Sequence, residues 1–199
     1  MPQKNPNDAT RPTSPAPTGA ANAAEFASPH WRVIAQGFDT EQWFNENQAR
    51  GTGGILNPQA TRLASGQYYY RFASSQATRD SQLGGGWWLD FDAFRTIERF
   101  ADSNGYRLKD AARLFLALPY DWTKVDLLVK SLLRSPLYAY TGLGKSAQGG
   151  DGADKGTKWI PTQYKAVRQL YIPGLYVKGR DEQLWQTVFD QPPRVTALR

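Results

Sequence analysis

Apolar and aromatic residues fall along the chain in two kinds of pattern, one of period two and one of period three to four. Residues 67–73 and 87–89 are short segments, called words below, that are rich in Tyr, Trp and Phe, which favour β-strands. Residues 137–140 and 167–172 repeat this character later in the chain, while 182–189 fits either a strand or a helix. The pattern predicts early strands and late strands with something else between them.

Helical spacing occupies that middle region and predicts three helices. The first lies between an aspartate cap, Asp90 or Asp92, and Gly105, with apolar residues three to four positions apart. The second spans about 108–118, and the third spans 121–132, where apolar side chains share one face. Strands, helices and strands in that order predict an α+β fold with a largely antiparallel, split sheet.

The first part of the chain has a different composition. Residues 1–29 consist mostly of Pro, Ala, Ser, Thr and Asn, and Phe26 is their only aromatic residue. Such a segment buries too little apolar surface to offset its ordering entropy, so we expect a disordered leader. Ordered structure should begin near 31–34, followed by a short helix capped by Thr40. The remainder, residues 30–199, is predicted to be one domain.

Composition narrows the chemistry. The 199 residues include no Cys, which excludes disulfides, thiolate nucleophiles and thiolate metal sites. His30 is the only histidine, which disfavours a Ser-His-Asp triad and a histidine-rich zinc site. Catalysis would have to use carboxylates, amides, hydroxyls or cations, and we expect no metal. No apolar run reaches the roughly 20 residues of a membrane span, and no signal peptide is visible, so we expect synthesis in the cytoplasm. The formal charge of +6 favours anionic partners.

Arg71 is the first candidate for function, because it lies inside the aromatic word Tyr70-Arg71-Phe72. A guanidinium is always charged and its planar fork suits a phosphate, so a buried arginine here would bind an anion. The same three residues also fit an edge strand on which the arginine side chain extends into solvent. The two interpretations stay open on sequence alone.

A second candidate is the word formed by Gly84, Gly85, Gly86, Trp87 and Trp88. Consecutive glycines let a ligand approach the backbone, and tryptophan offers a face for a flat ring. Neighbouring strand residues point to opposite faces, so one of the two tryptophans should lie in the core.

Residues 139–146 match a permissive form of the phosphate-binding P-loop, with Ala139 in place of the first glycine. A working P-loop needs a helix directly after it, whose amides hold the phosphates. The residues that follow are rich in Gly and Asp and predict no helix. We therefore interpret 142–157 as a flexible basic loop near a ligand.

The late word from Gln169 to Gly174 is the last candidate. Residues two apart on a strand share a face, so Gln169 and Tyr171 would point into the same cleft. As structure alone, this word is a buried strand followed by a Pro173-Gly174 turn.

Taken in order, these words resemble the ADP-ribosyltransferase fold and its NAD-glycohydrolase toxin relatives. The resemblance covers roughly residues 67–175. It implies that Arg71 holds the phosphates of NAD, with Tyr70, Phe72 and Ser74 beside it. It further implies that Gly85, Gly86, Trp87 and Trp88 line the nicotinamide pocket, and that the late strand carries Gln169 and Tyr171.

Two departures from the family pattern affect the expected activity. The Ser-Thr-Ser word is absent after the second strand, and the place of the Glu-x-Glu pair reads Gln169-Leu170-Tyr171. Loss of the carboxylate argues against modification of protein arginine and favours NAD hydrolysis or transfer to another acceptor. The resemblance thus implies a bacterial toxin or effector that uses NAD, has a macromolecular acceptor or none, meets an immunity protein, and is exported by a specialised secretion system into a target cell.

Two alternatives from other classes remain. One is a binding module without enzymatic activity, in which a basic and aromatic surface holds nucleic acid or an acidic protein. Its support is a cationic stretch interleaved with aromatic residues: Lys155, Lys158, Trp159, Tyr164, Lys165, Arg168, Lys178 and Arg180. The other is a structural protein associated with a phage or capsid.

Overall fold

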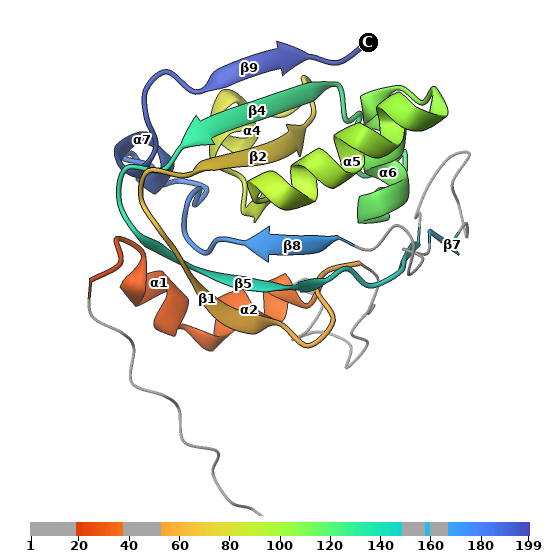
Figure 1. The fold of residues 1–199 in the computed structure, drawn as a ribbon. Coiled ribbons are helices and arrows are strands. Elements are labelled where there is room, and N and C mark those ends of the chain that lie inside the picture. Colours follow the sequence, from red (N-terminus) through yellow and green to blue (C-terminus); the bar gives the residue numbers. More distant parts are fainter. Residues whose placement is uncertain (1–18, 38–52, 149–157, 160–166) are drawn as a thin grey trace, which may run out of the picture.

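The computed structural model describes residues 19–37, 53–148, 158–159 and 167–199. Seen from the side, strands and helices form layers, with the N-terminal helices on one sheet and the central helices beside the other (Figure 1). The elements are α1 (Ala23–Ala27), α2 (Pro29–Ala35), β1 (Gln59–Leu63), β2 (Tyr68–Ala73), α4 (Arg79–Gly84), β3 (Trp87–Trp88), α5 (Phe91–Asn104), α6 (Leu108–Leu116), β4 (Leu127–Leu132), β5 (Leu137–Leu143), β6 (Ala147–Gln148), β7 (Lys158–Trp159), β8 (Arg168–Tyr171), α7 (Leu184–Val188) and β9 (Arg194–Ala197).

All strand pairs in the described residues are antiparallel. Four strands form one sheet in the order β1-β5-β8-β3, three form another in the order β2-β4-β9, and β6 pairs with β7. The two larger sheets meet where Tyr70 and Leu89 form an isolated bridge. The predicted α+β class with antiparallel strands is confirmed.

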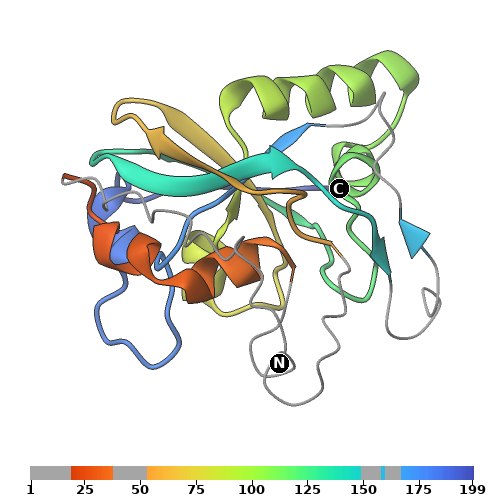
Figure 2. The same cartoon turned by 90° about the horizontal axis from the view of Figure 1, so that it is seen from below.

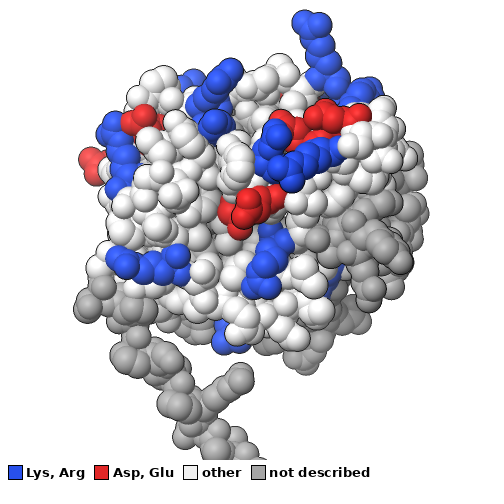
Figure 3. All heavy atoms as spheres, in the orientation of Figure 1, with Lys and Arg blue, Asp and Glu red and all other residues white. Residues whose placement is uncertain are grey.

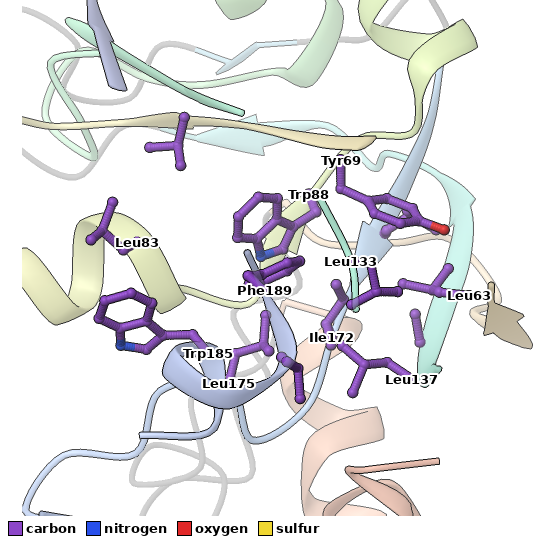
Figure 4. Close-up of a cluster of buried hydrophobic side chains, with 14 of the residues drawn as sticks. Leu63, Tyr69, Leu83, Trp88, Leu133, Leu137, Ile172, Leu175, Trp185 and Phe189 are labelled. Carbon is purple, nitrogen blue, oxygen red and sulfur yellow. The ribbon is translucent and has the colours of Figure 1, made fainter. Parts of the chain in front are cut away.

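The space between the two larger sheets is filled by the main hydrophobic core (Figure 4). Tyr69 from β2 and Val129 from β4 face this core from the three-stranded sheet, and Leu170 faces it from β8. Trp88 packs on Phe189 with ring centroids 4.8 Å apart. Because both sheets contribute side chains, the core joins them into one folding unit.

The first two predicted helices are confirmed as α5 and α6. The Asp90 carboxylate accepts a hydrogen bond from the Ala93 N–H at 2.8 Å and caps α5, which ends at Gly105 with φ 67°. The buried face of α5 lies on β2, where the rings of Phe94 and Tyr70 stack at 4.2 Å. This helix pair therefore covers the outer face of the arginine-bearing strand.

The third predicted helix is wrong. Residues 127–132 form β4, which pairs with β2 on one side and β9 on the other. Between α6 and β4, the buried Arg113 guanidinium donates hydrogen bonds to the carbonyls of Leu118, Pro119, Thr123 and Lys124, and Val125 adopts φ 53°. The apolar positions fit a helix, but sheet pairing on both sides stabilises the strand instead.

The predicted disordered leader is wrong for residues 19–29. Asn22 is fully buried: its amide donates to the carbonyls of Tyr138 and Pro173 and accepts from the Tyr138 N–H. Phe26 stacks on Tyr140 with centroids 4.6 Å apart. One asparagine and one aromatic ring thus anchor a stretch whose composition did not indicate burial. Residues 1–18, and the helix predicted after Thr40, lie outside the described residues.

Several shorter elements complete the comparison. The segment 182–189 contains the helix α7, and β1, α4, β6, β7 and β9 were not predicted. No helix in the described ranges has the length and apolar character needed to cross a bilayer.

Candidate functional site

Strands β2, β3 and β8 lie next to one another and bring the predicted site residues together. β3 pairs with β8, so that Trp87 lies opposite Tyr171. β2 reaches the end of β3 through two backbone hydrogen bonds between Tyr70 and Leu89, at 2.9 and 2.7 Å. Arg71 is next to this junction, and Gln169 lies two residues before Tyr171 on β8. Segments about 100 residues apart therefore meet at one place.

The Arg71 guanidinium points inward and is held by backbone carbonyls. Nε donates to Gln82 at 3.1 Å, Nη1 to Trp87 at 3.0 Å and Nη2 to Ser81 at 3.2 Å. Two of these carbonyls belong to α4: the Gln82 carbonyl lies in its last turn, where helix carbonyls lack an intrahelical partner, and the Ser81 carbonyl also accepts a hydrogen bond from the Gly85 N–H at 3.1 Å. Burial lowers the pKa of Arg71 to about 10, so the side chain is cationic at neutral pH. Two of its five N–H groups have no partner among the described residues.

The three consecutive glycines pack against the protein's own side chains. A Cβ atom on Gly85 would lie 2.0 Å from Nη2 of Arg71, and one on Gly86 would lie 2.6 Å from Cε2 of Tyr171. Gly84 approaches Trp185 in the same way. The side chains of Arg71 and Tyr171, and not a ligand, therefore occupy the space that the missing Cβ atoms leave at Gly85 and Gly86.

Of the two tryptophans, one belongs to the core, as expected. Trp88 is 2% exposed and its indole N–H donates to the Gly85 carbonyl at 2.7 Å. Trp87 is half-buried and meets the Tyr171 ring edge-on at 4.9 Å. The structure therefore leaves Trp87 as the ring able to face a ligand, and it places Trp88 away from one.

Tyr171 and Gln169 share one face of β8. Tyr171 is buried, and burial raises the pKa of its phenol well above the usual range, with Arg71 opposing part of the shift. Gln169 is half-buried opposite Gly142, and its amide makes no hydrogen bond to any described residue. The strand therefore presents a protonated phenol near Arg71 and, two residues earlier along the same face, an unpaired amide.

The other predicted residues lie outside this cluster. Tyr70 and Phe72 are on the opposite face of β2, packed with α5, because alternate strand residues point to opposite sides. The Ser74 hydroxyl accepts a hydrogen bond from the Gln76 N–H at 3.2 Å and belongs to the turn after β2. These three residues do not reach the Arg71 guanidinium face.

Two N-terminal residues that the sequence did not indicate form a wall of the site. Trp31 lies over Tyr171, with ring centroids 6.4 Å apart, and Phe26 lies over Tyr140. Figure 2 shows α1 and α2 lying across the four-stranded sheet that carries both tyrosines. The run Asn22-Ala-Ala-Glu-Phe-Ala, an asparagine before helix-forming residues, was the signal in the sequence.

Residues 139–146 form no P-loop, in agreement with the prediction that no helix follows them. The strand that a P-loop needs exists, since β5 ends at Leu143, but Ala147 and Gln148 continue as strand β6 where a helix would be needed. The predicted loop over 142–157 is wrong at 142–143, which belong to β5, and at 147–148, which form β6, whereas residues 149–157 lie outside the described residues. No group of three or more His, Asp or Glu side chains suited to a metal ion occurs in the described parts of the chain.

The cationic stretch of the alternative interpretation is only partly described. Lys155, Tyr164 and Lys165 lie outside the described residues, and Arg180 pairs with Glu25 at 3.1 Å. On the face seen in Figure 3, Lys and Arg are interspersed with Asp and Glu. That face carries no broad basic surface of the kind that nucleic-acid backbones bind.

Comparison of the chain with protein-family models, with curated proteins and with solved structures found no match.

Proposed function

We propose that this chain is an NAD-consuming enzyme of the ADP-ribosyltransferase type, acting as a bacterial toxin or effector. The observation that carries the proposal is the meeting of β2, β3 and β8 at the Arg71 guanidinium. The resemblance requires an arginine strand, an aromatic strand and a late strand to share one site, although the chain separates them by helices. The adjacency of these strands supports that requirement.

In the proposed site, Arg71 has two tasks. Three of its N–H groups hold the carbonyls of Ser81, Gln82 and Trp87, which positions the turn before β3. The remaining two N–H groups are donors for an oxygen of the NAD diphosphate. A preorganised cation of this kind costs no reorganisation when the ligand arrives.

Trp87 and Gln169 act on the two ends of the scissile bond. The Trp87 ring stacks on nicotinamide, and the Gln169 amide orients the ribose or an attacking water. The bond between C1′ of the ribose and the nicotinamide nitrogen breaks, and its electron pair neutralises the pyridinium. The oxygen of water, or of another acceptor, then bonds to C1′ and releases its proton.

The absence of a carboxylate at Gln169 and Tyr171 favours hydrolysis over transfer to protein arginine. An amide orients water but does not take its proton, because a carboxamide is not basic at neutral pH. We propose NAD hydrolysis as the main activity, with transfer of ADP-ribose to another macromolecule as the second possibility of the same chemistry.

The test is the release of nicotinamide from NAD by the purified chain. Gln169→Ala should lower the rate by about 10²–10⁴-fold, the range for removal of one catalytic polar group. Gln186→Ala makes the same substitution on an exposed position of α7 and should leave the rate unchanged. Wild-type chain without NAD turnover, or equal rates in both variants, would contradict the proposal.

A further inference from the structure

The outer edge of the three-stranded sheet is unpaired in the described structure. β9 is the terminal strand of that sheet and pairs only with β4. Figure 1 shows it as the outermost element on its side of the molecule. An edge strand of this kind presents backbone N–H and C=O groups to solvent.

The register identifies which residues present those groups. The Leu198 N–H donates to the Asp126 carbonyl at 2.8 Å, so this pair is a hydrogen-bonded pair of the ladder. Hydrogen-bonded pairs alternate along an antiparallel ladder. Arg194 and Thr196 therefore direct their backbone groups toward β4, while Val195 and Ala197 direct theirs away from the sheet.

No other strand pairs with the outer side of this edge in the described chain. All four residues of β9 are exposed, and the Val195 side chain is 45% exposed. The strand contains no proline. Natural proteins shield a free edge with proline, a bulge, a covering element, a charged side chain or a short strand. β9 has the last two, in its four residues and Arg194, but the outward backbone groups of Val195 and Ala197 remain a template for a further strand.

A hollow with a positive charge adjoins the start of β9. Its volume is about 180 Å³, and its lining includes Tyr68, Lys130, Leu132, Asp190, Pro192 and Arg194. The Lys130 ammonium lies over the Tyr68 ring at 4.2 Å, and Asp190 is already paired with Arg134. Arg194 has no ion pair with any described residue. The charge left to attract a ligand is therefore cationic.

We propose that β9 is the docking edge for an extended segment of an acidic protein partner. The segment adds a strand by pairing with the backbone groups of Val195 and Ala197, and one of its carboxylate side chains enters the hollow between Lys130 and Arg194. Backbone pairing supplies affinity in this mode of recognition, and the side-chain hollow supplies specificity. The overall charge of +6 favours the approach of an acidic partner.

A second copy of the chain is the competing occupant of this edge, because a free edge strand is also a template for pairing with an identical strand. The inference does not depend on NAD turnover, because β9 and the hollow share no residue with the candidate active site.

The test uses a labelled probe peptide and fluorescence anisotropy with the full chain. The probe is N-acetylated Glu-Val-Glu-Val-Glu-Val, and the charge control is Lys-Val-Lys-Val-Lys-Val. We expect the acidic peptide to bind and the basic one not to. Val195→Pro removes an outward N–H without removing a ladder bond, and should weaken binding at least about tenfold. Val195→Thr keeps the N–H and should bind like the wild type.

The combined change Lys130→Glu and Arg194→Glu should also weaken binding of the acidic peptide and permit binding of the basic one. The proposal is overturned if the acidic peptide does not bind, if Val195→Pro binds it as tightly as Val195→Thr, or if the basic peptide binds the wild type equally well. A dimer that Val195→Pro dissolves would assign the edge to a second copy, and displacement of the peptide by a single-stranded oligonucleotide would assign the hollow to nucleic acid. Nicotinamide release should be unchanged in all these variants, which keeps the outcome separate from that of the proposed function.

Discussion

At the scale of single residues, Arg71 shows how a charged side chain is tolerated inside an aromatic strand. Its guanidinium is inward-facing, and three carbonyls around the end of α4 and the start of β3 compensate the loss of water. Gly85 is the residue that permits this arrangement, because any side chain there would occupy the position of the guanidinium. The arginine and the glycine are one structural unit.

Gly85→Ala tests this unit. The backbone at Gly85 has φ −57° and ψ 152°, which alanine adopts without strain, so the effect reports only the contact with Arg71. The added Cβ would lie 2.0 Å from Nη2. We expect a loss of about 1–3 kcal/mol in the free energy of unfolding, measured by urea denaturation, together with a loss of nicotinamide release. An unchanged unfolding midpoint would mean that the guanidinium leaves its carbonyl partners at no cost.

At the scale of elements, the pairing of strands distant in sequence creates the candidate site. β2 and β4 lie side by side over six residues, and a polar contact extends this pair beyond its end. The Asp126 carboxylate, just before β4, accepts hydrogen bonds from the Ser75 N–H at 2.7 Å and the Ser75 hydroxyl at 2.5 Å, just after β2. These bonds hold the pKa of Asp126 below its ordinary value of 3.8.

This contact predicts a dependence of stability on acid. A carboxyl whose pKa is lower in the folded state stabilises the fold above its ordinary value of 3.8, and the contribution is lost as pH falls below that value. Ser75→Ala removes the hydroxyl donor. The difference in unfolding free energy between wild type and this variant should be full at neutral pH and shrink below pH 3.8. Ser65→Ala, at an exposed turn, should differ from wild type by the same amount at every pH.

At the scale of the whole molecule, the N-terminal helices, the two sheets and the central helices depend on shared cores. Asn22 connects α1 to Tyr138 on β5 and to Pro173 after β8, at the centre of the four-stranded sheet. Phe26 and Trp31 complete the aromatic cluster around Tyr140 and Tyr171. The segment before α2 is therefore part of the cooperative unit.

Asn22→Ala should destabilise the entire fold. It leaves two carbonyls and one N–H buried without partners, which costs about 2–4 kcal/mol. The unfolding midpoints measured by far-ultraviolet and by near-ultraviolet circular dichroism should both fall to the same lower value, because the fold unfolds as one unit. Asn104→Ala, at the exposed end of α5, is the matched control and should have little effect. Separate far- and near-ultraviolet transitions in Asn22→Ala would show that the helices unfold independently of the sheets.

Local chemistry in the sequence was sufficient for the elements with strong caps or strong β-propensity. Asp90 and Gly105 cap the two ends of α5 as predicted, and the segments rich in aromatic and β-branched residues form β2, β3 and β8. The same reasoning predicted that one of the two tryptophans lies in the core, but it left open whether Arg71 faces inward or reaches solvent. The α+β class followed from the order of these elements alone.

Only the tertiary structure decided the rest, because those outcomes depend on partners far along the chain. Residues 127–132 carry helical spacing, yet β2 and β9 pair with them on both sides. Residues 19–29 have the composition of a disordered segment, yet Asn22 and Phe26 meet β5 more than 100 residues away. The placement of Trp87 and Tyr171 near one guanidinium also required strand order, which no local pattern encodes. Local propensity acts over a few residues, whereas the pairing and burial that decided these cases act across the whole chain.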